Sequence, residues 1–361
     1  MRNVWKTAAI VLLLTIAAGC GFKDIDKRFF VVVIGVDKGE EKPYNVSLKL
    51  AIPSPQIRPG EAKSTIISVE GDTVAEAVNY MEAEVDKELD FGHAKMIVFG
   101  ESVAGQAMKE EIDWFIRRRD IQQVSYVGVG RPSAEAILKQ EPKSERLAGN
   151  TLFLSFDEEG TETPYIVTEF LFDFYRRWKE HGKDPYMPVI ETLRDAYRIR
   201  QVAVFNREGM KAVLSPEETA AFHQLVRQYP QFLVRTPGGD RPFVFSAQSL
   251  KIRYSFASGG GGPTVRVRAA VTGYAEETSE ELYDRQWSML EKQVGDILDQ
   301  KYTALLEKLR DLNVDPIGLG LKYVATKRGG ERDWEEWRSM YPRVRFDVDV
   351  DVKMHGTGLL E

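Results

Sequence analysis

The sequence has one cysteine and four histidines in 361 residues, so it offers few of the side chains that carry metal binding and nucleophilic catalysis. A single cysteine excludes an intramolecular disulfide, and no zinc-binding signature is present. The histidines do not pair at metal-ligand spacing; they are His93, His181, His223 and His355. Gly-x-Ser-x-Gly, Ser-x-x-Lys and dinucleotide-binding motifs are also missing. The sequence therefore gives no positive support for an enzyme, a cofactor or a metal ion.

An excess of positive charge is also absent. The chain has 49 Lys and Arg against 55 Asp and Glu, which gives a formal net charge of −6. A negatively charged protein has no long-range attraction to phosphate groups, so nucleic acid is not an expected partner. Two short basic clusters, Arg117–Arg119 and Arg176-Arg177, are interpreted as solvated helix faces.

The N-terminus has the pattern of a secretory signal peptide. Arg2 and Lys6 supply a positive region, and the apolar run at residues 8–18 follows and ends in small side chains. That run is well short of the roughly 20 apolar residues that a membrane-spanning helix needs. We therefore expect residues 1–19 to be a cleaved signal peptide.

A lipid-attachment motif follows the apolar run. Residues 17–20, Ala-Ala-Gly-Cys, resemble the lipobox of bacterial lipoproteins, with Ala17 at a position that is usually Leu. We expect cleavage after Gly19 and a diacylglycerol on the Cys20 thiol, with residues 20–28 as the tether. Acyl chains would then hold the protein at the outer face of a membrane. An unmodified surface cysteine is the alternative.

The chain after the leader has the composition of a globular protein and the length of more than one domain. Residues 29–195 alternate between strand and helix patterns, which predicts an N-terminal α/β region of two domains with parallel strand pairs. Asp72 is expected to cap the first helix. The expected elements are a strand hairpin at 29–36 and 45–52, strands at 65–69, 94–99 and 124–129, and helices at 74–85, 108–116, from Ser133 and at 166–178.

A change of pattern near residues 195–200 predicts a boundary before a C-terminal α/β domain at 200–361. The first expected elements are a strand at 201–205, a helix with a capping box from Ser215 to Glu218, and a hairpin of strands 243–257 and 263–275. A long amphipathic helix follows, from a second capping box at Thr278 and Glu281 through Leu312, and the last element is a strand at 344–354. The glycine-rich loop 258–262 lacks the Lys and Ser or Thr of a phosphate-binding loop. The fold class is thus α+β or mixed α/β, an ectodomain of three domains with mixed sheets and one long C-terminal helix.

Three aspartates alternate with apolar residues in the last strand: Asp347, Asp349 and Asp351. Their spacing suggests a calcium loop, but that loop needs Gly at its sixth position and Glu at its twelfth. The chain has Val352 and Gly358 there. The aspartates are therefore interpreted as the solvated face of a strand.

Several segments in chain order match the pattern of one protein family. They are Gly35-Val36-Asp37-Lys38, the stretch 92–101 with His93 and Lys95, the strand 202–205 with the helix start 217–219, the stretch 315–320 (Asp-Pro-Ile-Gly-Leu-Gly), Trp334 and Trp337, the strand 344–352 and the stretch 355–358. With the lipobox, these segments resemble the Ger(x)C family, the lipoprotein C subunits of nutrient germinant receptors in endospore-forming bacteria. One segment departs, because the family often has Trp-Asp directly after the cysteine, where this chain has Gly21-Phe22-Lys23-Asp24.

The resemblance implies a non-enzymatic ectodomain of three α/β domains at the outer face of the spore inner membrane. Its partners would be the integral-membrane A and B subunits, and it would act in receptor assembly and signalling during germination. The candidate partner contacts are Asp37, His93, Lys95, Trp334 and Trp337, each with a structural role as the alternative. Gly318 and Gly320 are expected to be turn glycines, and His355 a strand-end residue.

Two other functional classes remain open for an exported globular protein. An extracellular solute-binding lipoprotein would have a cleft between two α/β lobes. A secreted hydrolase of cell wall or sugar would need two carboxylates about 5 to 9 Å apart across a groove.

Overall fold

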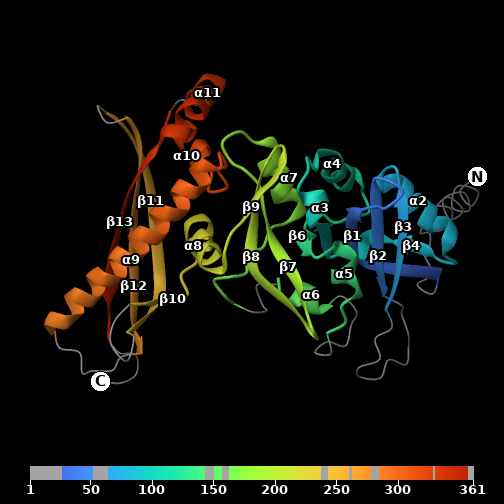
Figure 1. Ribbon diagram of the computed structural model, residues 1–361, viewed down its shortest axis with the longest axis horizontal. Coiled ribbons are helices and arrows are strands. Elements are labelled where there is room, and N and C mark those ends of the chain that lie inside the picture. The colour runs from blue at the N-terminus through green and yellow to red at the C-terminus, as the bar shows by residue number, and fades with distance from the viewer. Residues whose placement is uncertain are drawn as a thin grey trace, which may run out of the picture.

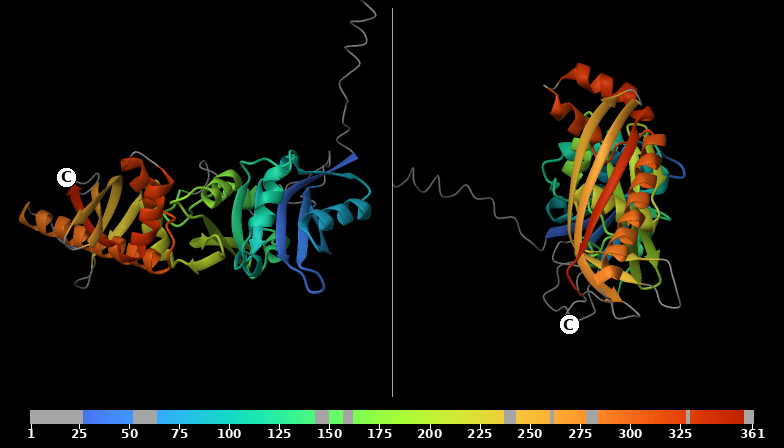
Figure 2. Two further views of the ribbon diagram at one scale, coloured as in Figure 1. Left: turned by 90° about the horizontal axis from the view of Figure 1, so that it is seen from above. Right: turned by 90° about the vertical axis from the view of Figure 1, so that its left-hand side faces the viewer.

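The computed structural model describes residues 27–51, 64–142, 150–156, 162–236, 243–259, 262–277, 284–327 and 330–356. In these residues, two β-sheets with their helices lie side by side along the long axis, so the molecule is elongated (Figures 1 and 2). The expected mixed α/β fold with mixed sheets is confirmed. The predicted signal peptide and Cys20 lie outside the described residues.

The N-terminal sheet has the strand order β3-β2-β1-β5-β6-β7-β8-β9, and β4 also pairs with β1. Its strands are β1 (Arg28–Lys38), β2 (Tyr44–Ala51), β3 (Ser64–Gly71), β4 (Glu88–Asp90), β5 (Met96–Gly100), β6 (Tyr126–Arg131), β7 (Tyr186–Leu193), β8 (Ala196–Asn206) and β9 (Gly209–Val213). The central pairs β1-β5, β5-β6 and β6-β7 are parallel, as expected, and the outer pairs β1-β2 and β7-β8 are antiparallel. The continuous apolar sequence of β1 fits a central strand that is covered on both faces.

Helices cover both faces of the N-terminal sheet (Figure 1). They are α2 (Val74–Glu84), η2 (Phe91–His93), α3 (Glu101–Ala104), α4 (Lys109–Arg117), α5 (Ala134–Lys139), α6 (Asn150–Leu154) and α7 (Leu171–Lys179). One buried cluster joins Met81 of α2, Phe115 of α4 and Phe174 of α7 to the sheet. A second cluster joins Ile137 of α5 and Leu152 of α6 to the opposite face. The region is therefore a three-layer arrangement.

One predicted helix cap and one predicted helix start in this region are wrong. Thr73, not Asp72, is the N-cap of α2, because its hydroxyl accepts a hydrogen bond from the Glu76 N–H at 3.1 Å. The aromatic helix starts at Leu171 rather than at residue 166. The Val127 N–H donates to the Glu169 carbonyl, so the preceding segment pairs with a strand instead of turning into a helix.

The C-terminal sheet has the order β10-β11-β12-β13. Its strands are β10 (Phe232–Arg235), β11 (Val244–Gly259), β12 (Gly262–Glu277) and β13 (Arg345–Met354), and its helices are α8 (Pro216–Arg227), α9 (Asp284–Asp311), α10 (Leu319–Thr326), α11 (Glu331–Met340) and η3 (Tyr341–Arg343). The predicted hairpin β11-β12 and the capping box of Ser215 and Glu218 are confirmed. The long amphipathic helix is α9, which runs along the sheet beside β13 (Figure 1). The box of Thr278 and Glu281 lies outside the described residues.

The solvated face of β13 is also confirmed. Asp347 lies 3.0 Å from Arg268 and 3.5 Å from Arg266, which stand on the neighbouring strand β12, and its side chain is 46% exposed. Asp349 pairs with Arg268 at 3.3 Å. These aspartates therefore have arginine partners across the strand pair. Among the described residues, no group of three or more His, Cys, Asp or Glu could hold a metal ion.

The two sheets share one apolar core. Tyr186 and Val204 belong to the N-terminal sheet, yet they pack in the same buried cluster as Phe222 of α8 and the residues of the C-terminal sheet. The predicted boundary at 195–200 falls in the antiparallel hairpin of β7 and β8. The division into three domains remains a prediction.

A buried histidine lies beside this shared core. His223 in α8 is 9% exposed, its Nδ1–H donates to the Pro164 carbonyl at 3.2 Å, and its ring stacks on Tyr229 at 4.3 Å. Burial lowers the pKa of His223 to about 4.

Acidification from pH 7 to pH 5 is therefore expected to remove about 2 kcal/mol of folding free energy through His223. The unfolded residue binds a proton near pH 6.5 and the folded residue only near pH 4, so stability that is present above pH 6.5 is lost as the pH falls toward 4. Urea unfolding at both pH values would measure the loss in the parent and in His223→Gln. An equal loss in both proteins would contradict the assignment.

Candidate functional site

Asp37 lies at the end of β1, beside the end of β5 and the start of α5. Its two carboxylate oxygens accept hydrogen bonds from the N–H groups of Ala134 and Glu135, each at 2.8 Å. Burial raises the pKa of Asp37, while the two N–H donors act in the opposite direction. A Cβ on Gly100 would lie 1.9 Å from the Asp37 carboxylate, so the segment 92–101 needs glycine there. Asp37 thus fixes the start of α5 and is buried away from solvent.

His93 and Lys95 lie near the start of β1, at the N-terminal end of the fold. The His93 side chain is 61% exposed, and its ring rests against Phe30 at 4.6 Å. Lys95 Nζ lies 3.5 Å from the Gln122 Oε1 and 5.9 Å from the Phe153 ring centre. Both side chains are open to a partner, and their predicted contacts remain predictions.

The stretch 315–320 forms the joint between the two sheets. The Asp315 carboxylate accepts three backbone hydrogen bonds at the start of α10, from Gly318 and Leu319 at 2.9 Å and from Gly320 at 2.6 Å. The Asp315 N–H also donates to the carboxylate of Asp184, which precedes β7, at 2.7 Å. Burial raises the pKa of Asp315 to about 7, against the effect of the three N–H donors.

Close backbone contact makes the joint tight. The Leu321 N–H donates to the Gly182 carbonyl at 2.9 Å, and Gly182 has a φ of +78°. A Cβ on Gly182 would lie 2.5 Å from the Leu321 nitrogen, and one on Gly320 would lie 2.6 Å from the Trp337 ring. Gly318 has a φ of +76°, which confirms it as a turn glycine. Gly320 lies in the first turn of α10, so the expectation of a turn glycine is wrong there.

The two tryptophans of the predicted contact set differ in exposure. Trp337 is 1% exposed and packs among Phe256, Tyr323 and Tyr341. Its burial gives Trp337 a structural role, as for Asp37. Trp334 is half-buried, with its ring 5.3 Å from that of His181. Trp334 therefore keeps a surface that a partner could contact.

A buried group of charges completes the joint. Glu169 accepts hydrogen bonds from Arg177 at 2.7 Å and from Arg227 of α8 at 3.1 Å, while Arg177 also donates to the Pro316 carbonyl at 3.0 Å. The solvated face predicted for Arg176-Arg177 is wrong for Arg177, which is 3% exposed. Helical spacing could have found it, because Arg177 follows the buried Phe174 by three residues in α7.

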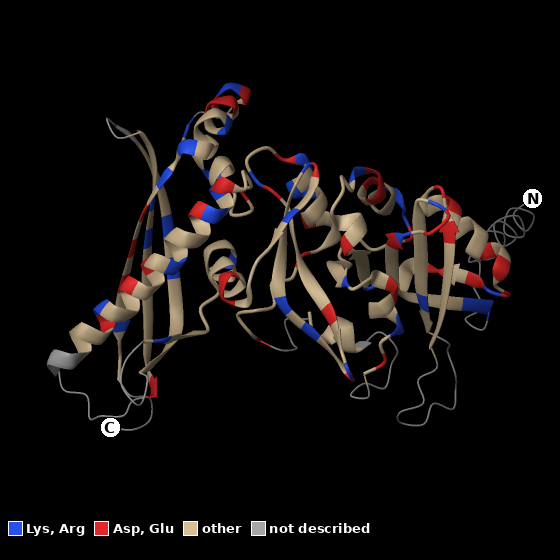
Figure 3. Ribbon diagram, viewed as in Figure 1, with Lys and Arg blue, Asp and Glu red and all other residues tan. Residues whose placement is uncertain are grey.

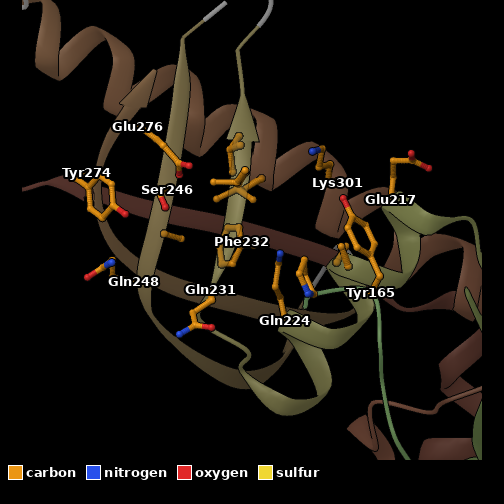
Figure 4. Close-up of a pocket in the computed structure, with 17 residues that line it drawn as sticks. Tyr165, Glu217, Gln224, Gln231, Phe232, Ser246, Gln248, Tyr274, Glu276 and Lys301 are labelled. Carbon is orange, nitrogen blue, oxygen red and sulfur yellow. The ribbon is translucent and has the colours of Figure 1, made fainter. Parts of the chain in front are cut away.

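A cavity of about 510 Å³ opens in the C-terminal region between the sheet and α8 (Figure 4). Lys301, Glu217 and Glu276 are among its polar lining residues. Hydrogen bonds from its own N–H and from Ser215 lower the pKa of Glu217. A general acid needs a raised pKa, so Glu217 does not fit that role in glycoside hydrolysis. Sequence reasoning missed the cavity because its lining comes from separate elements.

Lys and Arg positions are interspersed with Asp and Glu positions along the ribbon in both regions (Figure 3). In the part of the chain that the structure describes, no helix is long and apolar enough to cross a membrane.

Comparison with family models gives two matches that divide the chain. Residues 21–192 match the model described as "Spore germination protein N-terminal domain". Residues 200–358 match the model described as "Spore germination B3/ GerAC like, C-terminal". The matches follow the order of the segments singled out in the sequence.

Similar proteins have related descriptions. "Spore germination protein GerQC" of Bacillus cereus is 24% identical over 84% of this chain and 85% of that protein. "Putative spore germination protein YfkR" and "Spore germination protein KC" of Bacillus subtilis (strain 168) are 21% and 20% identical, each over 97% of this chain and 95% of the relative. The crystal structure of the GerBC protein superimposes with a TM-score of 0.57 at 14% identity, over 89% of this chain and 96% of that chain.

The structural likeness, at this identity, concerns the fold. The two family models together account for nearly all residues from 21 to 358. The chain therefore belongs to the Ger(x)C family of spore germination proteins, the family that its sequence segments resemble.

Proposed function

We propose that the protein is a lipid-anchored, non-catalytic subunit of a nutrient germinant receptor, at the outer face of the spore inner membrane. It acts there in assembly and signalling beside the integral-membrane A and B subunits. Family membership supports a role in spore germination. The names of the relatives support the same role, since each describes a spore germination protein.

The observation that carries the proposal is the joint between the two sheets. The shared core around Tyr186 and Phe222 and the buried contact of Asp184 with Asp315 connect the two sheets directly. Such a joint favours an ectodomain that moves as one body, so a partner contact that displaces one end also displaces the other end. An assembly subunit needs this property, whereas a solute-binding protein with a cleft between lobes needs a hinge.

The proposed anchor keeps one end of this body near the membrane. Cys20 precedes the first residue of β1, Arg28, by eight positions, which is a reach of at most about 28 Å. His93 and Lys95 lie at the same end of the sheet, so they are the proposed contacts with the A and B subunits. Tethering raises the effective concentration of the partners, and modest interfaces then suffice.

Replacing Cys20 with Ala is expected to abolish or strongly slow nutrient-triggered release of dipicolinic acid from spores. The lipid would be missing, so the protein would lose its position beside its partners. Spores of the parent, of Cys20→Ala and of a clean deletion would be compared, with immunoblots of the membrane fraction.

If release is lost in the deletion strain but not in Cys20→Ala, the protein acts in the receptor and the lipid is dispensable. Parent-like release in all three strains, with no redundant receptor present, would contradict the germination role itself. That result would favour the alternative function, an extracellular solute-binding lipoprotein.

A further inference from the structure

A second cavity, of about 720 Å³, lies between the start of α2 and the outer side of α4 in the N-terminal region. It is far in sequence from the joint and has no part in the function proposed above. Its wall combines aromatic and charged side chains, which include Tyr44, Asp72, Glu110, Glu111, Asp113, Trp114, Arg117 and Arg118.

Glu111 is the unusual member of this wall. It is 6% exposed, and its Oε1 accepts a hydrogen bond from the Tyr44 hydroxyl at 2.5 Å. Its Oε2 is buried and has no hydrogen-bond partner among the described residues. Burial raises the pKa of Tyr44, so the phenol stays protonated and donates. A buried carboxylate oxygen without a donor is unfavourable, because burial removes its hydrogen bonds to water and no protein donor replaces them.

The arginines of the wall do not supply the missing donor. Arg118 pairs with Asp120 through Nε at 2.8 Å, and its guanidinium lies over the rings of Phe91 and Trp114. The Arg117 side chain is 81% exposed and lies 4.0 Å from Asp113. Each arginine thus has its own acid, and neither supplies a donor to the Glu111 Oε2.

We propose that this cavity binds an organic cation with a primary ammonium or guanidinium group. The cationic group donates to the Glu111 Oε2, and the apolar stem lies against Trp114. A hydrogen bond between two charged groups is stronger than one between neutral groups. An aromatic face adds attraction for the cation and its stem. The same chemistry occurs in a free amine and in the lysine side chain of a partner protein.

Calorimetric titration of the whole chain, purified in detergent, tests the proposal with three probes. They are 1,4-diaminobutane for a free amine, Nα-acetyl-lysine N-methylamide for a partner's lysine, and 1,4-butanediol as the neutral control. At least one cation is expected to bind saturably, and the diol about tenfold more weakly or not at all. The tighter of the two cations identifies the source of the group.

Glu111→Gln is expected to weaken cation binding by about tenfold or more, because the neutral amide loses the charge. Glu110→Gln, an exposed neighbour in the same wall, is the matched control, and we expect a change of no more than about threefold. Tyr44→Phe removes the hydroxyl that donates to the Glu111 Oε1 and keeps the carboxylate. Cation binding should therefore persist in Tyr44→Phe, and this variant tests the proposal if Glu111→Gln folds poorly.

Three results would overturn the proposal: no saturable binding of either cation, equal binding of 1,4-butanediol, or equal affinity in the parent and Glu111→Gln. None of them affects the germination role, which the spore experiment tests separately.

Discussion

Arg177→Met is expected to destabilise the protein by about 3 to 5 kcal/mol, because it breaks a buried ion pair and leaves the buried Glu169 paired with Arg227, whose side chain is 44% exposed. The side chains of Arg177 and Glu169 are 3% and 0% exposed, and their atoms lie 2.7 Å apart. The change also leaves the Pro316 carbonyl, which accepts from Arg177 at 3.0 Å, without its donor. Urea unfolding followed by circular dichroism would measure the loss.

The adjacent residue provides the control for this prediction. Arg176 pairs with Asp173 at 2.7 Å, but its side chain is 50% exposed. Arg176→Met should therefore cost no more than about 1 kcal/mol. Adding Glu169→Leu to Arg177→Met should restore about 1 kcal/mol or more, since the buried charge is removed as well. If Arg177→Met and Arg176→Met cost the same, buried charges do not hold the joint.

Gly182→Ala is expected to cost about 3 kcal/mol or more, from two sources that add. A φ of +78° disfavours an L side chain by about 1 to 2 kcal/mol. The new Cβ would lie 2.5 Å from the Leu321 nitrogen and 2.7 Å from the Gly320 carbonyl carbon, both backbone atoms. Overpacking of this kind costs about 1 to 3 kcal/mol more. Thermal and urea unfolding would measure the sum.

Gly262→Ala separates the two sources. Gly262 has a φ of +96°, but no atom of the described residues lies within 4 Å of the place that the alanine methyl would take, so only the conformational part should appear. The difference between the two variants then measures the overlap in the joint. An equal loss in both would mean that the backbones of Gly182 and Leu321 separate easily.

Several elements were predictable because their information is local. The strict period of two in residues 345–354 and the helical period of Leu290, Leu298 and Leu305 each place apolar side chains on one face. The capping box of Ser215 and Glu218 likewise needs only neighbouring residues. For the same reason, the pattern of short segments was sufficient to identify the family.

The candidate sites were less predictable. Asp37 and Trp337 were expected as contacts, but both are buried in the fold. Arg177 was expected in solvent, but it pairs with a buried Glu169. Sequence patterns indicate which residue types occur on a helix face, but they do not indicate which neighbouring element covers that face.

By itself, the sequence determined the mixed α/β class, the long helix, the hairpin and the family, because each depends on periodicity or on the order of short segments. Only the tertiary structure decided the joint and the cation cavity. Asp184 and Asp315 are 131 positions apart, and Tyr44 and Glu111 are 67 positions apart. Local propensities carry no information about such pairs, since the packing of whole layers brings them together.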